Sequence, residues 1–280
     1  MNLHNFGCNK IYVISRDDAT KRRKDFSDVW DMFVDFEYVF VDAIKGEDIE
    51  VESTVFYDKV ASFSKNIYAT NLSHRKIYEM IISNEEPIDS TYLILEDDVR
   101  PTDYFFESIE NGVLENTIND LKKYTWDLFY WGRQQKKIHS LRYTDNLAIP
   151  TLFTDFGAHS YSISKAFAFE LYRNQTSVEM AADVYLDYQC YLKQKHYYSP
   201  YLSFFRQKQH IDEVWFREKN DCLYHYNSST QRNYKELGKR EGDYEWIHEN
   251  VENLVDSIDD VLINDEIEMK KITFNKKGLI

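Results

Sequence analysis

The sequence is poor in the residues that build linkers, disulfide frameworks and membrane spans. Of its 280 residues only 8 are glycine and 4 are proline, which argues against long disordered linkers. The three cysteines, Cys8, Cys190 and Cys222, have no metal-site spacing and form no even disulfide set, which favours a reducing compartment. No run approaches the ~20 apolar residues of a spanning helix, and residues 1–9 lack the apolar region of a signal peptide. We therefore expect a cytoplasmic protein without a membrane span.

Positive charge and phosphate-binding glycine motifs are also scarce. The formal net charge is −14, with no basic stripe to offset it, which disfavours nucleic acid and anionic membranes as main partners. Neither G-x-G-x-x-G nor G-x-x-x-x-G-K-[ST] occurs, so a classical dinucleotide or P-loop cradle is disfavoured. Such an acidic chain suits cation binding, although most of its carboxylates will simply be solvated.

What the sequence does contain is an alternation of short apolar runs and amphipathic segments. Strand patterns cover residues 10–14, 36–43, 91–96, 126–132 and 156–164. Helical patterns cover residues 20–33, 71–82, 105–124, 165–173 and 181–188. We expect Asn71 or Ser73 to cap the second helix, a break near Gly112, and an irregular excursion over residues 44–64. Alternating strands and helices predict an α/β fold with a mostly parallel central sheet flanked by helices.

The most informative stretch is residues 91–101, a buried-strand pattern that ends in Glu96, Asp97 and Asp98. Ligands of open α/β sheets bind outside the carboxyl ends of strands. Three adjacent carboxylates repel one another and need a cation, and oxygen ligands suit Mg²⁺ or Mn²⁺. The alternative interpretation is a solvated acidic turn.

Other residues form weaker candidates, each with a structural alternative. The basic cluster at residues 20–24 either receives a diphosphate or is the solvated first turn of a helix. Asp42 ends a predicted strand, where it either accepts from a ribose hydroxyl or closes a turn. Asp183 and Asp187 are four apart, so on a helix both carboxylates share one face, with Asp183 near the start as a base or a cap.

The order of these segments resembles glycosyltransferase family 25, the group of lipooligosaccharide and collagen galactosyltransferases. The motifs that carry the resemblance span residues 10–210. They are the arginines after the first strand, Ser73-His74, Glu96-Asp97-Asp98, residues 157–161 (Gly-Ala-His-Ser-Tyr), and Asp183 with Asp187. The Tyr-, Asn- and Lys-rich composition also resembles proteins of large DNA viruses, which would place the protein in host cytoplasm.

The resemblance implies a GT-A-type nucleotide-sugar-binding domain, which we place over residues 1–240. From about residue 242 apolar residues recur at helical spacing in an acidic segment, which predicts an amphipathic helical tail over residues 241–280. This tail would pack on the domain or form a homodimer. The family resemblance also implies a UDP-sugar donor, Mn²⁺ (or Mg²⁺) and inversion at the anomeric carbon. The donor sugar would be galactose, glucose or xylose, and the acceptor a hydroxyl of an oligosaccharide or glycoprotein glycan.

The resemblance also implies a role for each of several residues. Asp98 would bind the metal, Glu96 the ribose or the metal shell, and Asp97 would orient the turn. Nucleotide and donor contacts would come from Ser15, Arg16, Asp42, Ser73, His74 and Arg75. His210 or His225 would complete the metal shell. The sequence departs from the family where Ile14-Ser15-Arg16 replaces its usual Asn-Leu pair, and where the Gly-Cys pair often seen before Ser73 is missing.

Sugar transfer needs a base for the acceptor hydroxyl, which we assign to Asp183, with Asp187 as the alternative. His159 and Tyr161 would line the acceptor side, although a buried structural histidine is an equal alternative at residue 159. Two other functions stay open. Paired carboxylates also serve metal-dependent hydrolases, and an inactive relative would be a glycan-binding module.

Overall fold

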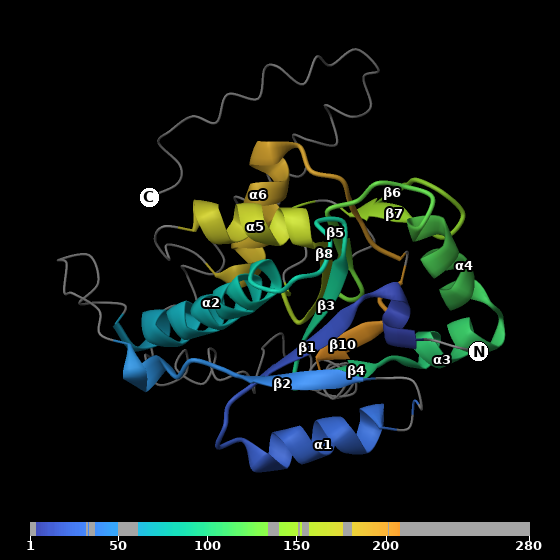
Figure 1. The fold of residues 1–280 in the computed structure, drawn as a ribbon. Helices are drawn as coiled ribbons and strands as arrows, with labels where there is room; N and C mark the ends of the chain where they lie inside the picture. The colour runs from blue at the N-terminus through green and yellow to red at the C-terminus, as the bar shows by residue number, and fades with distance from the viewer. Residues whose placement is uncertain are drawn as a thin grey trace, which may run out of the picture. The chain divides into compact units, whose positions relative to one another are not determined.

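A six-stranded sheet forms the centre of the computed structural model (Figure 1). The structure describes residues 4–31, 33, 37–49, 61–133, 140–150, 152, 157–175, 181–200 and 202–207. The predicted metal-shell histidines His210 and His225 and the predicted tail at residues 241–280 lie outside these residues. The division of the chain at residue 240 therefore stays a prediction.

The sheet has the strand order β2-β1-β3-β8-β5-β9. Its strands are β1 (Lys10–Ser15), β2 (Tyr38–Asp42), β3 (Thr91–Glu96), β5 (Leu128–Tyr130), β8 (Ser160–Ser164) and β9 (Tyr197–Tyr198). β1 is parallel to β2 and β3, and β5 is parallel to β9, whereas β8 is antiparallel to both β3 and β5. The predicted mostly parallel sheet is confirmed. Because β8 is reversed, it begins at the edge where β1, β3 and β5 end.

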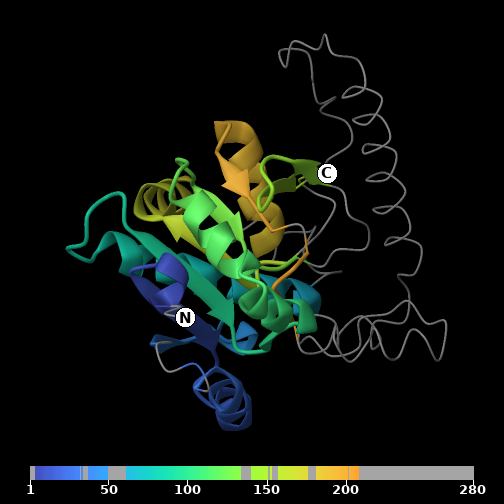
Figure 2. The ribbon, with the colours of Figure 1, turned by 90° about the vertical axis from the view of Figure 1, so that its right-hand side faces the viewer.

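Helices cover both faces of this sheet. They are α1 (Thr20–Trp30), α2 (Ala61–Ile82), α3 (Asp103–Glu110), α4 (Val113–Leu121), α5 (Lys165–Asn174) and α6 (Ala182–Lys193), with the 3-10 turns η1 (His4–Gly7) and η2 (Gly46–Asp48). One buried cluster joins alternate strand residues, such as Tyr12 and Ile94, to α2, α5 and α6. A second joins the intervening residues, such as Val13 and Leu95, to α1, α3 and α4. In both views α1 and the α5–α6 pair lie on opposite sides of the sheet (Figure 1; Figure 2). Burial on both faces explains the continuous apolar runs of the strands.

Two small antiparallel sheets flank the central one. β4 (Val99–Pro101) pairs with β10 (Phe205–Gln207), and β6 (Ser140–Arg142) pairs with β7 (Ala148–Pro150). The ring of Phe205 is buried, with its centroid 5.6 Å from Phe6 and 5.8 Å from Trp131. This aromatic packing holds β10 beside the end of β5, so that Gln207 lies opposite Val99, next to the acidic turn.

The largest correction concerns α2, which begins at Ala61 and not near residue 71. Ser73 is therefore no cap. Its hydroxyl donates to the carbonyl of Ala69 at 2.6 Å, as Thr70 does to Asn66 at 3.0 Å. Serine and threonine favour helix starts, but inside a helix they can bond backward in this way. Residues 61–64 of the expected excursion consequently belong to the helix.

The break expected near Gly112 is confirmed. The helix expected over residues 105–124 is broken at Gly112, whose φ of +78° suits glycine, into α3 and α4. Ser164 ends β8 and caps α5, its hydroxyl accepting from the Phe167 amide at 3.1 Å. Cys8 and Cys190 are buried free thiols. Among the described residues, no helix combines the length and the apolar character needed to cross a membrane.

Candidate active site

The predicted site residues gather along one edge of the central sheet. Ser15 ends β1 and Glu96 ends β3, and the two strands are parallel neighbours. His159 immediately precedes β8, and its carbonyl accepts a hydrogen bond from the Glu96 amide at 2.9 Å. Segments about sixty residues apart in the sequence thus meet at the end of β3. This is the edge at which α/β sheets bind ligands.

Glu96 is held by two side chains from other elements. His74 Nε2 of α2 lies 3.5 Å from Glu96 Oε1, and the Gln207 amide of β10 donates to Oε2 at 3.0 Å. Burial acts to raise the pKa of Glu96, but His74, His159 and Arg22 outweigh it and hold the pKa below the ordinary value. Glu96 is therefore a fixed anion at the centre of the edge.

Asp97 and Asp98 share a cation from α1. The buried Asp97 accepts from Ser15 Oγ at 2.7 Å and pairs with Arg22, which fixes the acidic turn against β1. Arg22 Nη2 also lies 3.3 Å from Asp98 Oδ2. Burial raises the pKa of Asp97 although Arg22 opposes the change. Asp97 is thus tied to both β1 and α1, and its orienting role stays a prediction.

One carboxylate oxygen of Asp98 is a candidate metal ligand. Its Oδ1 is buried and has no hydrogen-bond partner among the described residues. Burial and then the charge of Glu96 raise the pKa of Asp98 to about 7. A divalent cation would satisfy this oxygen and relieve the repulsion. No group of three His, Cys, Asp or Glu side chains within the described part of the chain could hold a metal ion, and His210 lies outside it.

A buried hydrogen-bonded chain lies behind Glu96. His74 Nδ1 is 2.7 Å from the hydroxyl of Tyr161, which in turn is 2.9 Å from the hydroxyl of Tyr78. All three side chains are at most 1% exposed. Tyr161, expected on the acceptor side, therefore reaches the edge through His74. The sequence does not distinguish Tyr78 from an ordinary core residue of α2.

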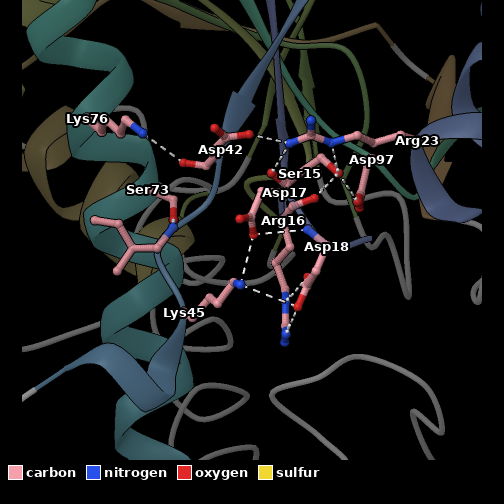
Figure 3. Close-up of polar contacts among 11 residues, drawn as sticks. Ser15, Arg16, Asp17, Asp18, Arg23, Asp42, Lys45, Ser73, Lys76 and Asp97 are labelled. Atoms are coloured by element: carbon pink, nitrogen blue, oxygen red, sulfur yellow. Dashed lines mark hydrogen bonds and ion pairs between the residues drawn. The ribbon is translucent and has the colours of Figure 1, made fainter. Parts of the chain in front are cut away.

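Ion pairs hold the loop after β1 in place (Figure 3). Arg16, an expected nucleotide contact, binds Asp18 through hydrogen bonds of 2.9 and 2.7 Å. Lys45 lies 2.9 Å from Asp17 and 3.4 Å from Asp18. The loop is consequently ordered by its own charges, and Lys45 adds a cation that no sequence motif indicated.

Asp42 lies beside this loop at the end of β2. Arg23 Nη2 donates to Asp42 Oδ1 at 2.5 Å and to the Ser15 carbonyl at 2.9 Å, while Lys76 Nζ donates to the Asp42 carbonyl at 2.9 Å (Figure 3). The cluster at residues 20–24 therefore supplies two arginines to the edge, Arg22 and Arg23, and both meet carboxylates.

Ser73 and Arg75 are the other two residues of α2 that we expected to contact the donor. Both contact groups of the protein itself. Ser73 Oγ accepts from the Ile44 amide at 2.9 Å, which ties α2 to the segment after β2 (Figure 3). Arg75 lies over the ring of Tyr172 in α5, 4.0 Å from its centroid. In this structure Ser73 supports the edge, and Arg75 packs against α5.

Both candidate bases lie on α6, as their spacing predicts. Asp183 is half-buried in the first turn, and its Oδ1 accepts from the Val184 amide at 2.8 Å. Burial, together with the charges of Asp187 and Glu96, raises the pKa of Asp183. Asp187 is buried and accepts from Tyr130 Oη at 2.6 Å and from Arg133 Nη2 at 2.9 Å. Asp183 is thus the more accessible carboxylate.

A protein-family model matches residues 8–186 with the description glycosyltransferase family 25 (LPS biosynthesis protein). This range is more than half of the 280 residues. The chain belongs to glycosyltransferase family 25. Membership confirms the resemblance and supports a glycosyltransferase activity, for which the protein would bind a sugar donor and an acceptor. The comparison with curated proteins found no match.

The family 25 match runs from just before β1 into the first turns of α6. It therefore contains the acidic turn, His74, His159 and Asp183, and it stops before Asp187. All the clustered residues of the β1–β3–β8 edge fall inside it apart from Gln207 of β10. The structure thus joins separate parts of the matched sequence into one site.

Proposed function

We propose that this family 25 member transfers a sugar from a UDP-sugar to a hydroxyl of an oligosaccharide or glycoprotein glycan, with inversion, on a GT-A-type fold. The observation that carries the proposal is the acidic turn at the end of β3, whose Asp98 has a buried, unpartnered carboxylate oxygen among the described residues. Galactose, glucose and xylose are the candidate donor sugars, and small differences in a pocket decide among them.

Glu96 and Asp98 are the residues that would hold Mn²⁺ or Mg²⁺, with His210 as the proposed third ligand. A bound divalent ion would neutralise charge on the departing diphosphate. Asp97 remains bound to Ser15 and Arg22, and so keeps the turn in place. Arg22 and Arg23 supply further positive charge beside the same edge, where it would favour a diphosphate.

Asp183 is the proposed base. Its carboxylate would take the proton of the acceptor hydroxyl as that oxygen forms a bond to the anomeric carbon. The bond from the anomeric carbon to the phosphate oxygen breaks, and its electron pair leaves with UDP. Attack from the face opposite the leaving group inverts the configuration. The half-buried position and raised pKa of Asp183 suit this role.

A screen of UDP-galactose, UDP-glucose and UDP-xylose with Mn²⁺, with and without glycan acceptors, tests the activity. Asp98→Ala should abolish turnover, whereas Glu107→Ala, which removes an exposed carboxylate from α3, should not. Turnover that survives in Asp98→Ala would refute the metal assignment. Product release that needs no acceptor would indicate a hydrolase. Glycan binding without any UDP binding in Mn²⁺, measured by calorimetry, would indicate a binding module.

Asp183→Asn tests the base separately. We expect UDP binding to stay intact and transfer to fall by roughly 10²–10⁴-fold. Because the pKa of Asp183 is raised, the acid limb of the wild-type rate should lie above the ordinary aspartate value of about 3.9. Transfer at the wild-type rate in Asp183→Asn would assign the proton to Asp187 or to water.

A further inference from the structure

A buried cation at the end of β5 has no part in the proposed transfer step. Arg133 and Asp187 of α6 are each 2% exposed. Arg133 Nη2 donates to Asp187 Oδ2 at 2.9 Å, and Nη1 lies 3.4 Å from Oδ1. A buried ion pair contributes little net stability, because the loss of hydration offsets the attraction. Fixed geometry is the property that such a bidentate pair supplies.

Neighbouring groups restrict the pair further. Tyr130 Oη donates to Asp187 Oδ1 at 2.6 Å, and the Arg133 guanidinium carbon lies 4.3 Å from the centroid of the Tyr130 ring. The Arg133 amide donates to Ser203 Oγ at 3.2 Å, and that hydroxyl lies 3.2 Å from the Arg133 carbonyl. Contacts with the central sheet and with the segment before β10 therefore hold Arg133 in place, and Arg133 and Tyr130 together fix the position of the Asp187 carboxylate.

The orientation of α6 follows from this contact. The N-cap residue Ala181 provides no side-chain cap, so the first turn is not fixed by such a bond. Asp183 lies one turn before Asp187 on the same helix face. When α6 is oriented about its own axis so that Asp187 contacts Arg133, Asp183 also faces the sheet edge. After burial, the charges of Asp187 and Glu96 both raise the pKa of Asp183, which agrees with that direction.

We propose that Arg133 is a positioning residue for sugar transfer. Together with Asp187 and Tyr130 it fixes the rotation of α6 about its axis and so directs Asp183 to the acceptor side of the edge. This inference rests on the proposed function, and it gives Asp187 a positioning role while Asp183 acts as the base.

The experiment compares Arg133→Lys and Asp187→Asn with wild type and with Lys193→Met, which removes an exposed cation from the same helix. Lysine keeps the charge but cannot make the bidentate contact. A displacement of about 1 Å at a reacting group can cost ~10²-fold in rate. We therefore expect kcat for transfer to fall at least about tenfold in Arg133→Lys and Asp187→Asn. The Kd for UDP in Mn²⁺ should stay within about twofold, and Lys193→Met should match wild type.

Hydrogen exchange of the α6 amides is measured on the same proteins, because it needs no activity. Faster exchange in the first turns of α6, with β1 and β3 unchanged, is expected for both pair variants. Unchanged exchange, or unchanged kcat, in Arg133→Lys would overturn the positioning role. So would a parallel loss of kcat and UDP affinity, which indicates general misfolding. If wild type turns over no UDP-sugar, the proposed function fails, and the exchange data still decide whether Arg133 anchors α6.

Discussion

Gly132 is the position where one added methyl group should disturb both the fold and the site. It follows Trp131 at the end of β5, where the Trp131 carbonyl accepts from the amide of Phe204 at 2.9 Å. A Cβ at Gly132 would lie 1.9 Å from the Phe205 carbonyl oxygen, 2.8 Å from its carbon and 3.0 Å from His159 Nε2. Gly132→Ala therefore forces backbone against backbone.

The size of the effect follows from what must move. The Phe205 carbonyl belongs to β10, which is paired with β4 over residues 205–207. Restoring an ordinary contact of ~3.5 Å requires a retreat of roughly 1.5 Å. Overpacking costs typically about 1–3 kcal/mol, and we expect the upper end, about 3 kcal/mol, because a flexible side chain cannot absorb the shift. Tm should then fall by roughly 6–12 °C.

Thermal and urea unfolding of Gly132→Ala and Gly112→Ala measure this cost. At Gly112 a Cβ would meet no atom within 4 Å, but φ is +78°, so its cost is conformational alone, about 1–2 kcal/mol. Because β10 also carries Gln207 to Glu96 at 3.0 Å, UDP binding in Mn²⁺ should weaken in Gly132→Ala and not in Gly112→Ala. A Gly132→Ala protein as stable as wild type, or more stable than Gly112→Ala, would refute the steric reasoning.

Three further outcomes are expected. Tyr161→Phe removes the hydroxyl 2.7 Å from His74 Nδ1, and His74 in turn contacts Glu96. Because Tyr161 acts on Glu96 only through His74, calorimetry should show Mn²⁺ binding weakened by up to about tenfold, the lower end of the effect of losing a direct partner of a metal ligand. Unchanged affinity would show that the hydrogen bonds behind Glu96 do not affect the metal. Burial raises the pKa of Cys8 from 9.0 to about 11, so its contribution to stability is complete below pH 9 and is lost as the pH rises to 11. Between about pH 8 and pH 11, the free energy of unfolding measured by urea titration should therefore fall by about 2 kcal/mol less in Cys8→Ala than in wild type. An equal fall in both proteins would contradict this. Lys165 Nζ donates to the Asn84 carbonyl and side chain at 2.6 and 2.9 Å and to a further loop carbonyl at 2.7 Å. Lys165→Met should therefore destabilise the fold by about 3 kcal/mol, and a wild-type Tm would show that water replaces these bonds.

The strands and the acidic turn were predictable because their signals are local. A strand buried on both faces is a continuous apolar run, and β1 and β3 show this directly. Glu96, Asp97 and Asp98 are adjacent in the sequence, so their proximity needs no fold. The predicted start of α2 was wrong for a related reason. Thr70 and Ser73 resemble helix caps locally, but their hydroxyls donate to carbonyls of the preceding turn inside the helix.

Contacts between residues that lie far apart in the sequence could not be predicted. The ion pair of Arg133 with Asp187 joins residues 54 apart, and Gln207 reaches Glu96 across 111 residues. No spacing rule connects such positions, since the reversed direction of β8 and the placement of β10 decide them. Asp187 therefore looked like an alternative base in the sequence, whereas its burial against Arg133 becomes visible once β5 and α6 are placed.

The strand order also separates the candidate site into two halves. β1 and β3 bring Ser15 and the acidic turn to one half, and β8 with α6 brings His159 and Asp183 to the other. The halves meet where the Glu96 amide donates to the His159 carbonyl at 2.9 Å. Neighbouring strands lie about 4.8 Å apart, so a ligand that crosses this seam contacts both halves. Substitutions at the β1–β3 half should therefore change donor and cation affinity, whereas substitutions of Asp183 and Asp187 on α6 should change the transfer rate alone. An Asp183→Asn protein that binds UDP much more weakly than wild type would contradict this separation.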